Sequence, residues 1–202
     1  MTDYLLQQAT PVYWSMLDLV EPAHRAYAAR HRLEYIVERH APPVSSWVGF
    51  QKLPLLKALV ERPDTGLVLW IDADALAVGY TDPRTALGDG LVGMSRHPGR
   101  TAPTTVNAGV IFLKGCQRVA DWLQMVIDSG PGVYPWYEQD IMDASLAQPE
   151  WEGYYVNLPH IWNSTAILKH PKECEIRAWH GFATIPYRAA AMRAEMVRRR
   201  LF

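Results

Sequence analysis

The spacing of apolar residues changes along this chain between a period of two and a helical period, and these changes mark the predicted elements. Residues 4–8 and 33–37 have the pattern of short strands, whereas the apolar residues of 12–20 recur at helical spacing. Pro22 is predicted to break that helix and to begin a second one that runs to about Arg32, since proline suits a first helical turn. Residues 51–61 are predicted to form a further helix.

The next predicted strand, residues 67–71, is apolar on both of its faces. Such a strand lies in the middle of a sheet that is covered by helices on each side. The order strand, helix, strand, helix, strand predicts an α/β fold with a mostly parallel sheet. Ligands of open α/β sheets bind beyond the carboxyl ends of the strands, where Asp72 and Asp74 follow this strand directly.

The second half of the sequence continues the mixed pattern and shows neither an internal repeat nor a low-complexity segment. We therefore expect it to extend the same domain. Its predicted strands are residues 91–96, 106–113, 154–158 and 175–179, and its predicted helices are residues 117–127, 138–147 and 186–202.

Composition narrows the class of protein. With 202 residues, 49% of them hydrophobic, the chain is predicted to fold as one domain over residues 1–202. Its 20 basic and 21 acidic residues lack the basic excess that is typical of nucleic-acid binders. Cys116 and Cys174 share no metal-type spacing with the histidines, and no targeting or membrane-spanning segment is visible, so a cytoplasmic protein with reduced thiols is expected.

The two carboxylates after the central strand, Asp72 and Asp74, are separated only by Ala73. Residues two apart in an extended chain point the same way, so the two side chains are expected on one side. Like charges held together repel unless a cation or solvent separates them, which predicts a divalent metal site. The alternatives are a solvated loop, or a phosphohydrolase of the haloacid-dehalogenase type with Asp72 as nucleophile, although that motif normally lies on the first strand of its domain.

Four blocks of sequence resemble GT-A fold glycosyltransferases, especially the family 8 and family 34 groups, which retain the anomeric configuration. WVGFQKLPLLKALVERPDTGLVLWIDADA, from Trp47, resembles the approach to their Asp-x-Asp motif, and VNAGVIFLKG, YEQDIM and LPHIWN follow in the same order. A late AWHGF places His180 where these enzymes have a third metal ligand. The resemblance implies a GT-A (Rossmann-like), mostly parallel sheet flanked by helices, and transfer of a sugar from a nucleoside-diphosphate sugar, with UDP favoured.

The resemblance also implies the chemistry of the site. A Mn²⁺ or Mg²⁺ ion held by Asp74 and His180 would neutralise the diphosphate as it leaves. Asp72 is expected to be a further metal ligand or a donor-binding bridge between the ribose and the metal. Gln139 or Asp140 would lie beneath the anomeric carbon, where a side-chain oxygen stabilises positive charge on the sugar ring. For Glu138 and Asp140 the alternative is that they favour the first turn of a helix through its dipole. A covalent intermediate is not specified by these residues.

The remaining predicted donor contacts come from five positions. Asn107 is expected to form a hydrogen bond with the donor sugar. Gly109, which has no side chain, is expected to let the backbone approach that sugar. The resembling families commonly carry a lysine on the diphosphate after the metal histidine; this chain has none there, so Arg188 is expected to take that role, with Lys52 as a second candidate. Topology alone places the nucleoside near Thr10.

The acceptor is not identified by the sequence and remains open among glycans, proteins, lipids and nucleic acids. Aromatic residues near the proposed site, such as Tyr134 and Trp136, suit stacking on a sugar but equally suit packing. The arginine-rich segment 186–202 suits an anionic acceptor or a solvated helix end. A protein that binds sugar nucleotides or glycans without turnover is the non-enzymatic alternative.

Overall fold

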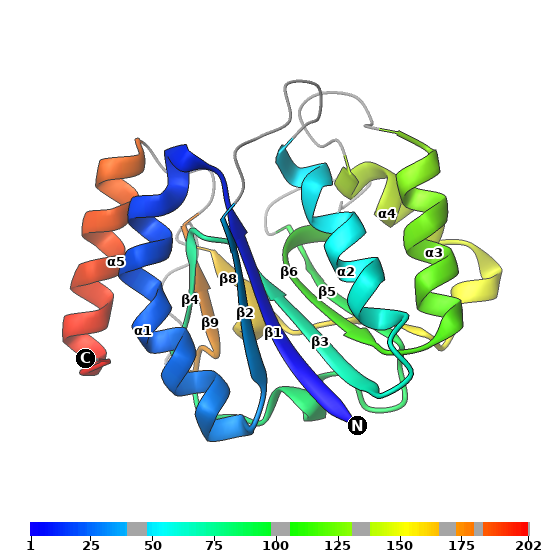
Figure 1. Ribbon diagram of the computed structural model, residues 1–202, viewed down its shortest axis with the longest axis horizontal. Helices are drawn as coiled ribbons and strands as arrows, with labels where there is room; N and C mark the ends of the chain where they lie inside the picture. The colour runs from blue at the N-terminus through cyan, green and yellow to red at the C-terminus, as the bar shows by residue number, and fades with distance from the viewer. Residues whose placement is uncertain (40–47, 98–105, 131–137, 166–172, 180–183, 202) are drawn as a thin grey trace.

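The structure of the protein is a computed structural model (Figure 1). Its described residues are 1–39, 48–97, 106–130, 138–165, 173–179 and 184–201. His180, Tyr134 and Trp136, which the sequence singled out, lie outside these ranges. No helix among the described residues is long and apolar enough to cross a membrane.

A large sheet forms the centre of the fold, and in the described part of the chain it has six strands. All of them run in one direction except the fourth in spatial order, which pairs antiparallel with both of its neighbours. The predicted mostly parallel sheet is therefore confirmed. The strands in spatial order are β2 (Glu34–Arg39), β1 (Thr2–Ala9), β3 (Thr65–Ile71), β6 (Val106–Lys114), β5 (Val92–Arg96) and β7 (Tyr155–Asn157).

Helices cover both faces of this sheet (Figure 1). Strand β3 is apolar on both sides because Val68 and Trp70 pack into the core under one group of helices, whereas Leu69 and Ile71 pack into the core on the opposite face. The first group is α2 (Lys52–Val60), α3 (Gln117–Asp128) and α4 (Glu138–Leu146); the second face carries α1 (Trp14–His31), with α5 (Ile185–Arg199) packed beside it.

Helix α1 differs from its prediction, because it runs without interruption through Pro22. The predicted break at this residue is wrong. Buried side chains on both sides of the proline, among them Met16, Val20 and Tyr27, hold the helix against the core, and Pro22 itself is exposed. Tertiary burial therefore outweighs the hydrogen bond that proline removes from the helix.

A second, small sheet lies on the α1 side and was not predicted as a separate sheet. It joins the segment that follows the aspartates to two strands from late in the sequence, in the order β4 (Ala75–Ala77), β9 (Ile176–Ala178) and β8 (Ser164–Thr165). Asp72 and Asp74 thus lie between β3 of the large sheet and β4 of the small one. Short 3₁₀ helices complete the described chain: η1 (Pro11–Tyr13), η2 (Val48–Gln51), η3 (Pro83–Ala86), η4 (Pro149–Trp151) and η5 (His160–Asn163).

Candidate functional site

The segment from Asp72 to Ala75, which we call the aspartate turn, leaves β3 as a tight turn and not as an extended chain. The Asp72 N–H donates to Gly109 O of β6 at 2.8 Å, and the Ala75 N–H donates back to Asp72 O at 3.0 Å. Between the carboxylates, Ala73 is buried in a small cluster with Ala9 and Leu17. The extended geometry assumed from the sequence is therefore wrong, because the chain turns at residues 73–74 before it enters β4.

Asp74 is a buried carboxylate with a cationic partner on α5. Its Oδ2 accepts a hydrogen bond from Arg188 Nη1 at 2.9 Å. Burial raises the pKa of Asp74 above its ordinary value, although the Arg188 guanidinium acts in the opposite direction. The arginine predicted to contact the diphosphate therefore lies directly against one of the two aspartates.

Lys52 is almost fully buried at the start of α2 and lies close to the other aspartate. Its Nζ is 3.9 Å from Asp72 Oδ1 and donates to Ala108 O of β6 at 2.8 Å. Burial alone would lower the pKa of Lys52, but the carboxylates of Asp72, Glu138 and Asp74 outweigh it and raise the pKa above its ordinary value. A buried ammonium with a raised pKa thus lies beside the aspartate turn.

Glu138 and Trp70 complete the surroundings of this lysine. Glu138 Oε1 lies 3.2 Å from Lys52 Nζ and is buried, whereas the Trp70 indole N–H donates to Asp72 Oδ1 at 2.7 Å. Sequence reasoning left Glu138 open between a place in the family-like segment and a helix-dipole residue, and it missed Trp70. The signal for a role of Glu138 in the site was its position directly before Gln139, at the start of the Glu-Gln-Asp segment of the YEQDIM block.

Strand β6 joins several predicted donor-binding residues. Gln139 Oε1 accepts the Ala108 N–H at 3.2 Å and lies 3.3 Å from His97 Nε2, so both the amide and the carbonyl of Ala108 are held by predicted site residues. Asn107 is buried, and its Oδ1 accepts the Gly109 N–H at 2.9 Å. The structure therefore brings Lys52 and Gln139 together at β6, next to the aspartate turn.

Two further predicted residues lie just after β1 and in the first turn of α4. Thr10 is buried at the end of β1, where its carbonyl accepts the Tyr13 N–H at 2.8 Å, and its hydrogen bonds among the described residues do not reach the other predicted positions. Asp140 is exposed on the first turn of α4. The roles predicted for both residues therefore remain predictions.

Asp72 and Asp74 carry carboxylate oxygens, the kind of ligand that a hard divalent cation prefers. Asp74 is buried, and the Asp72 side chain keeps 34% of its surface exposed. No three His, Cys, Asp or Glu side chains in the described ranges form a metal-binding group. The predicted third ligand, His180, lies outside those ranges.

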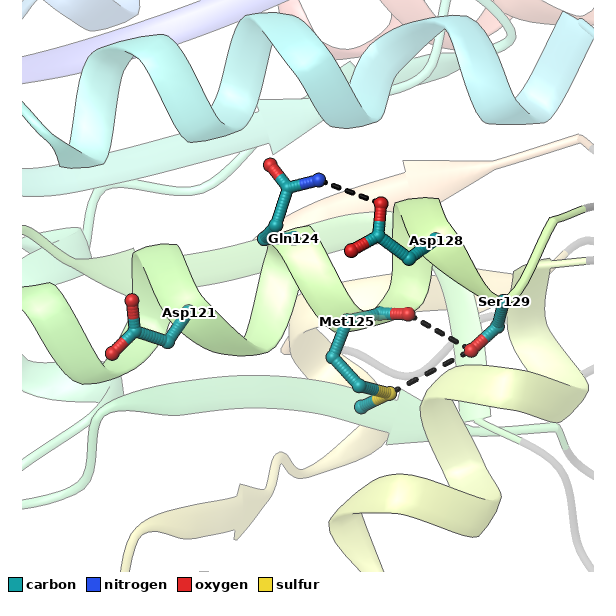
Figure 2. Close-up of a pocket in the computed structure, with 5 residues that line it drawn as sticks. All are labelled: Asp121, Gln124, Met125, Asp128 and Ser129. Atoms are coloured by element: carbon teal, nitrogen blue, oxygen red, sulfur yellow. Dashed lines mark hydrogen bonds between the residues drawn. The ribbon is translucent and has the colours of Figure 1, made fainter.

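A separate hollow of about 530 Å³ lies along α3 (Figure 2). Its carboxylates are engaged within their own helix: Gln117 Nε2 donates to Asp121 Oδ1, and Gln124 Nε2 donates to Asp128 Oδ1, each at 2.8 Å. The residues that line it do not include any of the predicted site residues. We therefore place the candidate site at the aspartate turn, and α3 supplies positions for control variants.

Comparison with known proteins gives a consistent result for the fold. No protein-family model matches the sequence, and no curated protein matches it. Among solved structures, a glycosyltransferase involved in the glycosylation of the major capsid of PBCV-1 is 16% identical with a TM-score of 0.73, and the match covers 96% of this chain and 100% of that chain.

Two further structures have the same fold. GlyE of Streptococcus pneumoniae is 14% identical with a TM-score of 0.60; the match covers all of this chain but only 64% of GlyE. The galactosyltransferase LgtC, solved with donor and acceptor sugar analogues, is 14% identical with a TM-score of 0.56, and the match covers 94% of this chain and 96% of LgtC. The chain thus has the α/β fold of these glycosyltransferases.

Proposed function

We propose that the chain is a metal-dependent glycosyltransferase that moves a sugar from a nucleoside-diphosphate sugar to an acceptor still to be identified, with retention of configuration. The observation that carries this proposal is the grouping of Lys52, Asp72 and Gln139 around β6, at the carboxyl end of β3. The fold shared with glycosyltransferases supports it, since open α/β sheets bind ligands at this edge.

The aspartate turn would hold a Mn²⁺ or Mg²⁺ ion through Asp72 and Asp74, with His180 as the proposed third protein ligand. When bound, this ion supplies a Lewis acid that neutralises the charge on the leaving diphosphate. Arg188 already contacts Asp74, so a phosphate that reaches this carboxylate also reaches a guanidinium. Lys52 adds a second positive charge on the other side of the turn.

The residues on β6 and α4 would act on the sugar. Gln139 is held by the Ala108 N–H, which fixes the orientation of its amide, and its side-chain oxygen is proposed to stabilise positive charge on the ring. Asp140 is proposed to share this role or to bind sugar hydroxyls. Asn107 and Gly109, both on β6, are proposed to contact the donor sugar. Thr10 is proposed to contact the nucleoside, and UDP is the proposed nucleotide.

A single catalytic domain over residues 1–202 and a cytoplasmic location stay predictions from the sequence.

The test is release of free nucleoside diphosphate from a panel of sugar nucleotides, with Mn²⁺, with Mg²⁺ and with chelator. The wild-type protein should release one nucleotide in a metal-dependent way, and Asp72→Asn should reduce the rate by about a hundredfold or more. Asp128→Asn, which changes a carboxylate on α3 outside the site, is the matched control and should keep the wild-type rate.

Two further measurements, of aspartyl-phosphate formation and of nucleotide binding, distinguish the alternatives. A phosphohydrolase with Asp72 as nucleophile would ignore sugar nucleotides and form an aspartyl-phosphate that Asp72→Asn abolishes. A protein that binds sugar nucleotides without turnover would bind donor with metal and release nothing with any acceptor. Failure to bind any nucleotide would contradict the glycosyltransferase proposal.

A further inference from the structure

A buried amide and a buried imidazole lie behind the aspartate turn, on the α1 side of the large sheet. Gln7 of β1 and His24 of α1 are both fully buried. Buried polar side chains of this size lower stability unless their hydrogen-bonding groups are satisfied. The partners of these two residues therefore indicate why polar groups are present in an otherwise apolar layer.

Gln7 continues the pairing between β1 and β3 at the point where the backbone ladder ends. The last paired residues of these parallel strands are Leu6 and Trp70. Beyond this pair, Gln7 Nε2 donates to Ile71 O at 3.2 Å and to Asp72 O at 3.4 Å. The side-chain amide thus bonds the two carbonyls that lead into the aspartate turn, beyond the last paired residues of β1 and β3.

His24 holds the other end of the turn. The Ala77 N–H of β4 donates to His24 Nε2 at 3.0 Å, so this ring nitrogen carries no proton. The proton therefore lies on Nδ1, which donates to Gln7 Oε1 at 2.7 Å. Tyr35 of β2 donates its hydroxyl to the same oxygen at 2.6 Å, and together these bonds fix the orientation of the Gln7 amide.

We propose that Gln7 and His24 form a clamp that sets the geometry of the two aspartate carboxylates. The clamp is the direct Gln7–His24 hydrogen bond, which connects the carbonyl of Asp72, at the start of the turn, to the N–H of Ala77, just after its end. Neither residue touches the proposed substrate, so both are positioning residues. The expected effect on metal binding rests on the proposed function. The expected effect on the geometry of the turn does not.

Substitutions at His24 separate the two halves of the clamp. His24→Asn keeps an amide donor near the Nδ1 position and loses the acceptor for Ala77, whereas His24→Gln reaches the Nε2 position and keeps an acceptor there. Gln7→Met removes both donors to the turn at similar volume. Tyr35→Phe is the matched control, because it removes one hydrogen bond to Gln7 and leaves every bond to the turn.

The first measurement is amide hydrogen exchange in the free protein, over a peptide that spans residues 72–78 and one in β6. His24→Asn and Gln7→Met should accelerate exchange in residues 72–78 by about tenfold, with β6 unchanged. His24→Gln keeps the acceptor for Ala77 but loses the donor to Gln7, so it should accelerate exchange less, and Tyr35→Phe should behave like the wild type. If Gln7→Met does not fold, His24→Asn still decides the result. Exchange in residues 72–78 that stays at the wild-type rate in His24→Asn would overturn the clamp.

The second measurement is the affinity for Mn²⁺ in the presence of UDP, read from the electron paramagnetic resonance signal of free Mn²⁺. The dissociation constant should rise by at least about tenfold in His24→Asn and stay within about twofold in Tyr35→Phe, as for other residues that orient metal ligands from behind. Faster exchange with wild-type Mn²⁺ affinity would overturn the positioning role. A wild-type protein that binds neither Mn²⁺ nor UDP, while the exchange result holds, would instead overturn the proposed function.

Discussion

Lys52 Nζ and Glu138 Oε1 lie 3.2 Å apart, with both side chains almost fully buried. The two residues come from the first turns of α2 and α4, so their ion pair joins two helices on the same face of the large sheet. Lys52 also donates to Ala108 O, which ties this pair to β6. The pair is therefore a structural element of the candidate site as well as a source of charge.

Removing one partner of this pair leaves an uncompensated buried charge. We expect Lys52→Met to lower the free energy of unfolding by about 3 kcal/mol or more, and the double variant Lys52→Met/Glu138→Gln to lose clearly less than the two single variants together. Urea denaturation of the four proteins measures the coupling. Strictly additive losses would contradict the ion pair.

Gly49 leaves room for the Glu138 carboxylate. A Cβ atom at position 49 would lie 2.5 Å from Glu138 Oε1 and 2.7 Å from its carboxyl carbon, and Lys52 restrains that carboxylate from moving away. Gly49→Ala should therefore lower the free energy of unfolding by about 1 to 3 kcal/mol. Glu138→Asp, whose shorter side chain withdraws from position 49, should reduce this loss when the two changes are combined. An equal effect of Gly49→Ala in both backgrounds, measured by urea denaturation, would argue against the contact.

The position of the candidate site could be predicted from the sequence because its main signal is local. An apolar strand that ends in Asp72 and Asp74 specifies both a central position in the sheet and a charged carboxyl end. Lys52 and Gln139 followed from a resemblance, and the structure brings them to the same strand. The direction of β6 was not predictable in this way, since apolar alternation is the same for a parallel and an antiparallel strand.

Residues that act through the tertiary fold were missed for a physical reason. Gln7 lies near the end of β1 and His24 lies within α1, and neither forms a sequence motif with Asp72 or Asp74. Their hydrogen bonds span 17 residues between each other and more than 50 to the turn. The turn geometry of Asp72 and Asp74 depends on pairing of Ala75–Ala77 with β9, which lies about a hundred residues later in the sequence.

Pro22 provides a test of the uninterrupted helix α1. It lies inside the helix, where it removes one backbone hydrogen bond, and its side chain is exposed. Pro22→Ala should therefore raise the free energy of unfolding by about 1 to 3 kcal/mol. Pro11→Ala is the matched control, because Pro11 begins η1 and its missing N–H has no helical partner to lose. A lower melting temperature in Pro22→Ala than in the wild type would contradict this prediction, because it would mean that Pro22 stabilises the folded protein.

His24 should make stability depend on pH, because burial lowers its pKa from 6.5 to about 3. Between these values the unfolded chain binds a proton that the folded protein does not bind, so stability falls as the pH drops below 6.5 and is unaffected by this group above it. From pH 7.5 to 4.5 the loss from His24 should be about 2 to 3 kcal/mol.

His24→Gln isolates this contribution, because it keeps an acceptor for the Ala77 N–H and cannot titrate. Urea denaturation of the wild type and the variant at both pH values gives two losses, and the loss in the variant should be smaller by the amount assigned to His24. Other titrating groups contribute equally to both proteins and cancel in this difference. Equal losses would mean that the folded protein protonates His24 as readily as the unfolded chain does, which is incompatible with Nε2 as the acceptor for Ala77.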